Sequence, residues 1–136
     1  MDDVNNDSIK AKARGVTAYR SNLFADAIRE FTDAIHLAES SEAKESIYQV
    51  YGNRCAAYQQ LNQYEKAIKD AKACTRLQPS WGKGWSHLGR CESQLGRYDK
   101  AIAAYHQAST LESDRAKAKE YEKLIQQVKQ VRTHLY

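Results

Sequence analysis

The chain has 136 residues, which is the size of one compact domain. Its 21 lysines and arginines exceed its 17 aspartates and glutamates by only four, so it lacks the dense basic stripe that is typical of nucleic-acid-binding proteins. A mean hydropathy of −0.77, with no long apolar run, argues against a transmembrane helix. We therefore expect neither nucleic acid nor a membrane as a partner.

The composition favours helix. There is one proline and there are six glycines, whereas alanine, lysine, glutamine and glutamate are plentiful, which predicts an all-α fold. The start, MDDVNNDSIK, lacks the apolar core of a secretory signal, and three cysteines without Cys-x-x-Cys spacing imply no disulfide framework. We expect a cytoplasmic protein, because a reducing compartment suits these thiols.

Residues 1–7 are predicted to be a polar leader, and a repeating pattern follows them. An aromatic residue, two mostly polar residues and Ala-Ile recur as Phe24-Ala25-Asp26-Ala27-Ile28, Tyr64-Glu65-Lys66-Ala67-Ile68 and Tyr98-Asp99-Lys100-Ala101-Ile102. The second and third copies are 34 residues apart, and the first and second are 40 apart, which is the same period with six extra residues. A period of this length indicates a repeat architecture. The repeats are 8–41, 48–81 and 82–115.

Each repeat is predicted to be two helices joined by a short turn. The turns lie at Ser21-Asn22, Leu61-Asn62 and Leu95-Gly96, since Asn and Gly tolerate the left-handed conformation that ends a helix. Small residues share one repeat position at Gly15, Cys55 and Gly89, where neighbouring helices must approach closely. We expect the aromatic residues Phe24, Tyr64 and Tyr98 to fill the apolar centre of each pair.

Two further segments complete the chain. The six extra residues, 42–47, are expected to lengthen the start of the third helix, with Ser40 or Ser41 as its N-cap. Residues 116–136 are predicted to form a capping helix with a charged outer face. Its apolar stripe comprises Ala118, Tyr121, Leu124, Ile125, Val128 and Val131. This stripe also offers a surface for weak self-association.

No catalytic motif is present. A Gly-rich phosphate loop, a His-x-x-x-His pair and a Gly-x-Ser-x-Gly elbow are all absent from the sequence. His36, His87, His106 and His134 are scattered and lack metal-ligand spacing with the cysteines. We expect no enzyme activity, no metal and no cofactor.

The repeat pattern resembles the tetratricopeptide repeat, whose signature is W-x2-L-G-x2-Y, then A-x3-F, then P. The third repeat carries Trp85-x2-Leu88-Gly89 and Ala101-x3-Tyr105, and the second ends at Pro79. The resemblance covers 102 of the 136 residues. It implies a right-handed α-solenoid of three helix-turn-helix repeats, with a concave groove lined by the first helix of each repeat.

Three segments resemble the co-chaperone subgroup of these repeats, represented by the Hsp-organising and small glutamine-rich proteins. They are Lys12-Ala13-Arg14-Gly15, Tyr51-Gly52-Asn53-Arg54-Cys55-Ala56-Ala57-Tyr58 and Trp81-Gly82-Lys83-Gly84-Trp85-Ser86. The resemblance implies a two-carboxylate clamp that holds the C-terminal Glu-Glu-Val-Asp of the seventy- and ninety-kilodalton heat-shock chaperones.

Three of the five clamp positions match, at Lys12, Asn53 and Lys83. Val16 stands where Asn is usual, and His87, which is only partly charged near neutrality, stands where Arg is usual. Arg90 adds a further positive charge to the predicted groove.

The two departures leave an alternative open. The groove of a general assembly scaffold would bind a different peptide or a helix, without a requirement for a terminal carboxylate.

Overall fold

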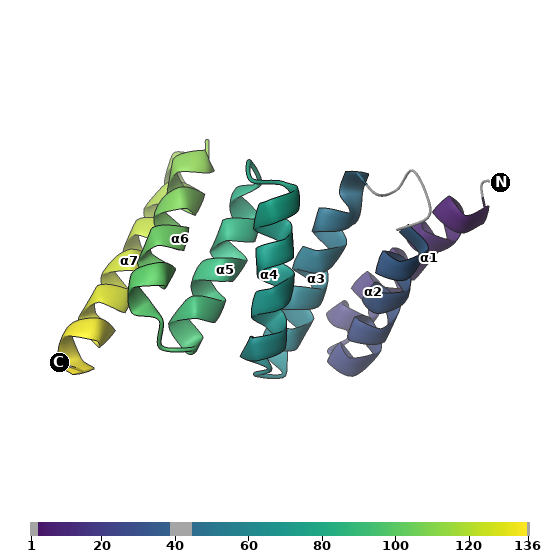
Figure 1. Cartoon of the computed structure of the whole chain (residues 1–136), viewed down its shortest axis with the longest axis horizontal. Coiled ribbons are helices and arrows are strands. Elements are labelled where there is room, and N and C mark those ends of the chain that lie inside the picture. The colour runs from purple at the N-terminus through teal and green to yellow at the C-terminus, as the bar shows by residue number, and fades with distance from the viewer. Residues whose placement is uncertain (1–2, 39–44, 136) are drawn as a thin grey trace. The chain divides into compact units, whose positions relative to one another are not determined.

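The computed structural model describes residues 3–38 and 45–135, and within these ranges the protein consists of seven helices and no strands (Figure 1). The helices are α1 (Asp3–Arg20), α2 (Phe24–Ala38), α3 (Ile47–Gln60), α4 (Tyr64–Leu77), α5 (Gly82–Gln94), α6 (Tyr98–Leu111) and α7 (Arg115–Leu135). They form two compact units, residues 1–70 and 71–136, with α4 contributing its first half to one and its second half to the other. The predicted all-α fold is confirmed.

The turns inside the three helix pairs share one backbone geometry. Asn22, Asn62 and Gly96 have positive φ angles of 62°, 58° and 77°. The residue after each of them donates its N–H to a carbonyl in the last turn of the preceding helix, as Leu23 does to Ala18 at 2.9 Å. These bonds satisfy carbonyls that the end of a helix would otherwise leave unpaired. The turn positions predicted from the sequence are confirmed.

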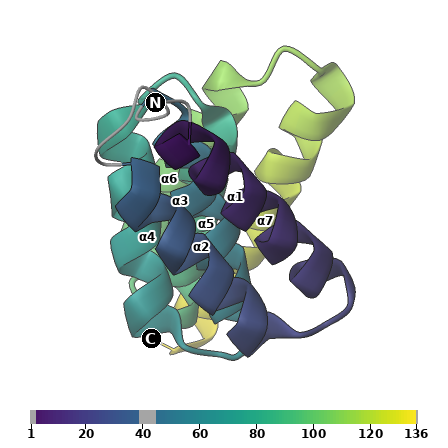
Figure 2. The same ribbon diagram turned by 90° about the vertical axis from the view of Figure 1, so that its right-hand side faces the viewer.

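The core of the N-terminal unit lies where α1 crosses α2 (Figure 2, with α1 toward the viewer). A Cβ atom added at Gly15 would lie 2.4 Å from the ring of Phe31, so only glycine allows this approach. Phe31 is 1% exposed and belongs to a cluster that α1, α2 and α3 build together. The unit also buries a polar anchor, because the Ser8 hydroxyl donates a hydrogen bond to the carbonyl of Ala34 at 2.9 Å.

The C-terminal unit repeats this arrangement. A Cβ atom at Gly89 would lie 2.9 Å from the ring of Tyr105, the counterpart of Phe31 in α6. Helix α7 packs on α6 through Ile125 and Val128, which are 2% and 6% exposed. The predicted stripe of α7 therefore reaches the core in its middle, whereas Val131 near its end is 48% exposed.

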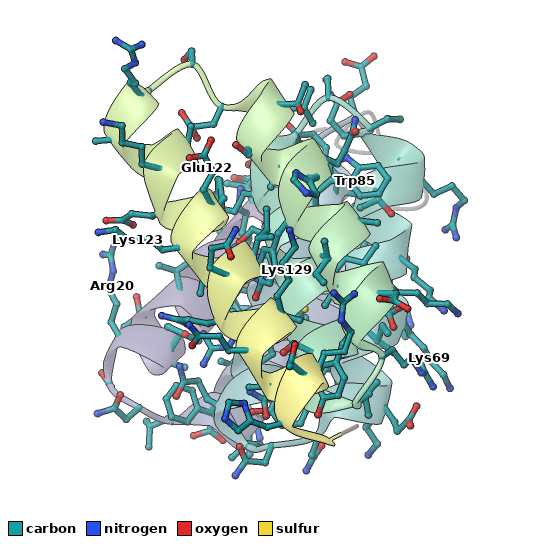
Figure 3. All side chains as sticks on the ribbon, turned by 90° about the vertical axis from the view of Figure 1, so that its left-hand side faces the viewer. Arg20, Lys69, Trp85, Glu122, Lys123 and Lys129 are labelled. Carbon is teal, nitrogen blue, oxygen red and sulfur yellow. The ribbon has the colours of Figure 1, made fainter. Side chains whose placement is uncertain are left out.

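The opposite face of α7 is charged. Lys123 is exposed and points away from α6, and the exposed Glu122 and the half-buried Lys129 lie on the same helix (Figure 3). Asp99, at the start of α6, forms an ion pair with Arg132 near the end of α7. This division into an apolar and a charged face is that of a helix packed on one side only.

Two expectations differ from the structure. Phe24, Tyr64 and Tyr98 are half-buried, not central, because each begins its helix beside the turn, next to solvent. The buried aromatic residues of the pairs are Phe31 and Tyr105, two turns further along.

The helix boundaries also differ from the predicted segments. Helix α1 begins at Asp3, so residues 3–7, expected as a leader, are helical, and the buried Ser8 bond holds this part of the helix to α2. Helix α3 begins at Ile47 after a 3-10 turn at residues 45–46. The predicted caps, Ser40 and Ser41, lie outside the described residues.

Candidate functional site

In the N-terminal unit, α1 and α3 bring polar side chains together across 37 residues of sequence. The Lys12 ammonium donates a hydrogen bond to Gln49 Oε1 at 2.8 Å, and Gln49 Nε2 donates to the Tyr48 hydroxyl at 3.3 Å. Gln49 and Asn53 are four residues apart in α3 and therefore share a helix face. The structure thus places the charge of Lys12 against the face of α3 that carries Asn53.

Val16 is one turn beyond Lys12 in α1. Its side chain is half-buried and packs against the core cluster of this unit, so the position offers no hydrogen bond. One turn further, the Tyr19 hydroxyl accepts a hydrogen bond from Gln60 Nε2 at 3.3 Å. Two glutamine amides of α3 therefore reach polar groups of α1, on either side of the apolar Val16.

In the C-terminal unit, Lys83 and His87 share a cavity of about 550 Å³. Its other lining residues are Trp81, Gly82, Ser86, Leu111, Glu112, Lys117, Glu120, Tyr121 and Leu124. Burial lowers the pKa of His87 to about 4, and the positive charges of Lys83 and Arg90 act in the same direction. His87 is therefore neutral at pH 7, and Lys83 carries the charge of this pair.

Arg90 lines a neighbouring cavity of about 350 Å³ between α5, α6 and α7. Ser86 and Leu124 line both cavities, so Arg90 adjoins the Lys83 site without sharing it. Burial raises the pKa of Tyr105, which lines the second cavity, to about 12, although the positive charge of Arg90 opposes the shift. Tyr105 consequently stays protonated at physiological pH.

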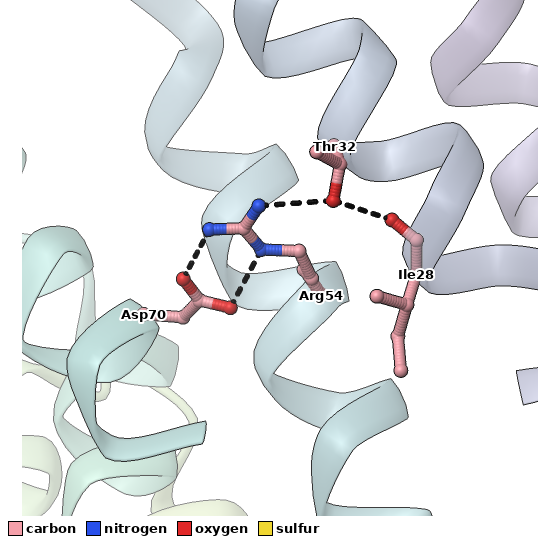
Figure 4. Close-up of polar contacts among 4 residues, drawn as sticks. All are labelled: Ile28, Thr32, Arg54 and Asp70. Atoms are coloured by element: carbon pink, nitrogen blue, oxygen red, sulfur yellow. Dashed lines mark hydrogen bonds and ion pairs between the residues drawn. The ribbon is translucent and has the colours of Figure 1, made fainter. Parts of the chain in front are cut away.

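A buried ion pair next to Asn53 was not predicted from the sequence. Arg54 donates from Nε to Asp70 Oδ2 at 2.9 Å and from Nη2 to Oδ1 at 2.7 Å, and from Nη1 to the Thr32 hydroxyl at 3.1 Å (Figure 4). Thr32 in turn donates to the carbonyl of Ile28 at 2.7 Å. Burial raises the pKa of Asp70, against the opposing effect of Arg54. The network fixes the helix turn that carries Asn53.

A signal for this pair exists in the sequence. In the first repeat, Arg14 and Glu30 occupy the same repeat positions as Arg54 and Asp70, with the same separation of 16 residues. They too form an ion pair, at 2.8 Å. A search for opposite charges at equal repeat positions would have identified both pairs.

The comparisons with known proteins identify the fold. A family model described as "Bacterial transcriptional activator domain" matches residues 3–129. The solved TPR domain of Sgt2 from Aspergillus fumigatus is 27% identical, with a TM-score of 0.79 over 94% of this chain and 80% of that one. The chain belongs to the matched family, and it is a tetratricopeptide repeat (TPR) domain. The resemblance inferred from the sequence is confirmed.

The curated relatives of this TPR domain are named as heat shock proteins or as Hsp70-Hsp90 organizing proteins. "Heat shock protein STI1" of Saccharomyces cerevisiae is 34% identical over 109 residues, and "Hsp70-Hsp90 organizing protein" of Triticum aestivum is 36% identical over 103 residues. These matches cover 80% and 76% of the chain but 18% and 17% of the relatives. The chain therefore spans under a fifth of the length of either protein.

A further solved structure shares the fold and carries a peptide. The first TPR of Spaghetti (RPAP3), bound to the HSP90 peptide SRMEEVD, has a TM-score of 0.82 at 19% identity, over 94% of both chains. At this identity the likeness describes the fold alone.

The part of the chain that the structure describes lacks two kinds of feature. None of its helices combines the length and apolarity needed to span a bilayer. None of its histidine, cysteine, aspartate and glutamate side chains come together in a group of three that could hold a metal ion.

Proposed function

We propose that this TPR domain is a co-chaperone module that binds the acidic C-terminal tail, ending Glu-Glu-Val-Asp, of seventy- and ninety-kilodalton heat-shock chaperones. The observation that carries the proposal is the Lys12–Gln49 contact, which holds an ammonium group against the face of α3 that bears Asn53. The names of the relatives support it, as does a peptide of this kind on the same fold in another protein.

The proposed mechanism is a carboxylate clamp. Lys12 and Asn53 donate charge-assisted hydrogen bonds to one carboxylate of the tail, and Lys83 binds the other. His87 contributes a neutral hydrogen-bonding group in place of an Arg fork, because its pKa of about 4 keeps it uncharged.

Val16 and Arg90 take lesser roles in this proposal. Val16 provides an apolar contact beside Lys12, and Arg90 attracts the acidic tail from its neighbouring cavity. The proposal includes no catalytic step, and it places the protein in the cytoplasm, where the buried thiols of Cys55, Cys74 and Cys91 stay reduced.

A general assembly scaffold is the second candidate. It is favoured by one observation, that Val16 and His87 leave two of the five clamp positions without charge or amide. The two functions differ in one requirement, since a clamp needs the free terminal carboxylate of its peptide and a scaffold groove does not.

Calorimetry with a peptide ending Glu-Glu-Val-Asp tests the proposal. We expect micromolar affinity that weakens with salt, and loss of binding when the terminal carboxylate is amidated. Lys83→Glu should abolish binding. Lys123→Glu on the outward face of α7 changes the net charge equally and should leave the affinity within twofold (Figure 3). Unaltered binding by Lys83→Glu would exclude the clamp, and equal affinity for the amidated peptide would favour the scaffold.

A further inference from the structure

The side-chain amide of Gln49 both accepts and donates a hydrogen bond in the N-terminal unit. Its Oε1 accepts a hydrogen bond from the Lys12 ammonium at 2.8 Å, and its Nε2 donates to the Tyr48 hydroxyl at 3.3 Å. An amide nitrogen has two hydrogens and an ammonium has three. After both bonds are made, Gln49 retains one donor hydrogen and Lys12 retains two, so both groups can still bind a carboxylate.

The position of Gln49 complements the apolar Val16. Val16 is one turn beyond Lys12 in α1 and packs on the core, so α1 supplies no amide beside the lysine. Gln49 is one turn before Asn53 in α3 and is half-buried, so α3 supplies two amides on one face. The clamp pattern has an amide on α1 at the position of Val16, whereas in this structure the amide that contacts Lys12 comes from α3.

We propose that Gln49 is a specificity-determining residue of the peptide site, which orients Lys12 through its carbonyl oxygen and presents its amide N–H to the terminal carboxylate of the ligand. This inference rests on the proposed function, because the ligand is the same acidic chain end. It adds a residue and a role that the clamp pattern does not contain.

The affinity of the wild-type protein and its variants for a peptide ending Glu-Glu-Val-Asp tests this role. Gln49→Leu removes both hydrogen bonds at similar volume, and we expect about tenfold weaker binding, the effect of one charge-assisted hydrogen bond. Gln49→Glu would place a carboxylate beside Lys12 that competes with the peptide, and should weaken binding further. Gln60→Leu is the matched control, because Gln60 lies in the same helix and its amide binds Tyr19 at 3.3 Å, not Lys12.

A double-mutant cycle separates a binding role from a structural one. Because Gln49 acts partly by orienting Lys12, the loss of affinity in the Lys12→Ala/Gln49→Leu double variant should be smaller than the sum of the two single losses. Restoring an amide on α1 with Val16→Asn in the Gln49→Leu background should recover most of the lost affinity. Thermal melting of each variant shows that the comparison is made between folded proteins.

The outcomes distinguish this inference from the function on which it rests. Wild-type binding that persists unchanged in Gln49→Leu would overturn the role of Gln49 and leave the clamp intact. Additive losses in the double-mutant cycle would likewise reject the coupling to Lys12. A wild-type protein that does not bind the peptide at all would overturn both proposals.

Discussion

Arg54 and Asp70 are joined by two hydrogen bonds, 2.7 and 2.9 Å long, and the side chains involved are 18% and 4% exposed. The guanidinium also lies 5.6 Å and 6.0 Å from the ring centroids of Tyr51 and Tyr58 and reaches Thr32 in the preceding helix. One side chain of α3 therefore links α2 to α4. Loss of the Arg54 side chain would leave the buried carboxylate of Asp70 without a counter-ion.

We predict that Asp70→Ala lowers the free energy of unfolding by about 3–5 kcal/mol, because it leaves Arg54 buried without its counter-ion. Urea denaturation followed by circular dichroism measures the change. The double variant Arg54→Met/Asp70→Leu, which replaces both charges with apolar groups, should recover much of the loss. A single Asp70→Ala variant as stable as wild type would contradict the prediction.

The equivalent pair of the first repeat provides the control. Arg14 and Glu30 bond at 2.8 Å with the same sequence separation, but their side chains are 57% and 20% exposed. Solvent screens such a pair, so Glu30→Ala should cost less than about 1 kcal/mol. A large effect of Glu30→Ala would show that position in the repeat, and not burial, determines the strength of the pair.

Gly15→Ala should destabilise the protein by about 1–3 kcal/mol, because the new Cβ atom would lie 2.4 Å from the Phe31 ring and force it to move. Thermal melting measures the effect. Gly82→Ala serves as control, since its nearest neighbour, the Ala108 carbonyl oxygen, would be 3.4 Å away. We expect the double variant Gly15→Ala/Phe31→Leu to recover part of the stability lost in Gly15→Ala. Equal melting temperatures for Gly15→Ala and Gly82→Ala would refute the steric argument.

His87 should make the protein less stable in mild acid. Its pKa is about 4 in the folded protein and near 6.5 when unfolded, so the unfolded state binds more protons between these values. The stability present above pH 6.5 is lost as the pH falls toward 4, by at most about 3 kcal/mol. Denaturation midpoints of wild type and His87→Gln across this range test the prediction, and parallel pH profiles would contradict it.

The docking of α7 depends on the middle of its apolar stripe. Ile125→Ala should cost about 2–5 kcal/mol, since this side chain is 2% exposed and lies in the core cluster of the unit. Val131→Ala, at a site 48% exposed, should change stability by less than about 0.5 kcal/mol. Self-association through this stripe stays a prediction, which sedimentation of wild type and Val131→Asp over a concentration series would test.

The repeat pattern was sufficient to predict the helix pairs and their turns. Asn22, Asn62 and Gly96 were identified because few residues adopt a positive φ, and the small residues Gly15 and Gly89 because a close helix crossing excludes side chains. The buried aromatic residues were assigned wrongly. Phe24 and Tyr98 have the same period as Phe31 and Tyr105, and periodicity alone does not say which of two apolar positions faces the crossing.

The candidate site was only partly predictable for a related reason. Lys12 and Asn53 could be carried over from a known pattern, whereas Gln49 and the Arg54–Asp70 pair depend on how neighbouring helices are rotated about their axes. Gln49 is 37 residues from Lys12, and no local sequence spacing indicates that the two side chains form a hydrogen bond. The low pKa of His87 likewise arises mainly from burial, and further from Lys83 and Arg90 on the same helix. The sequence shows the two cations but does not show the burial.

The bond between Lys12 and Gln49 affects the entropy change of ligand binding. Because this hydrogen bond already restricts the rotamers of Lys12 in the folded protein, the side chain loses less conformational entropy when a ligand binds. In the proposed clamp, long-range attraction between the lysine and the acidic peptide would then contribute to the rate of association.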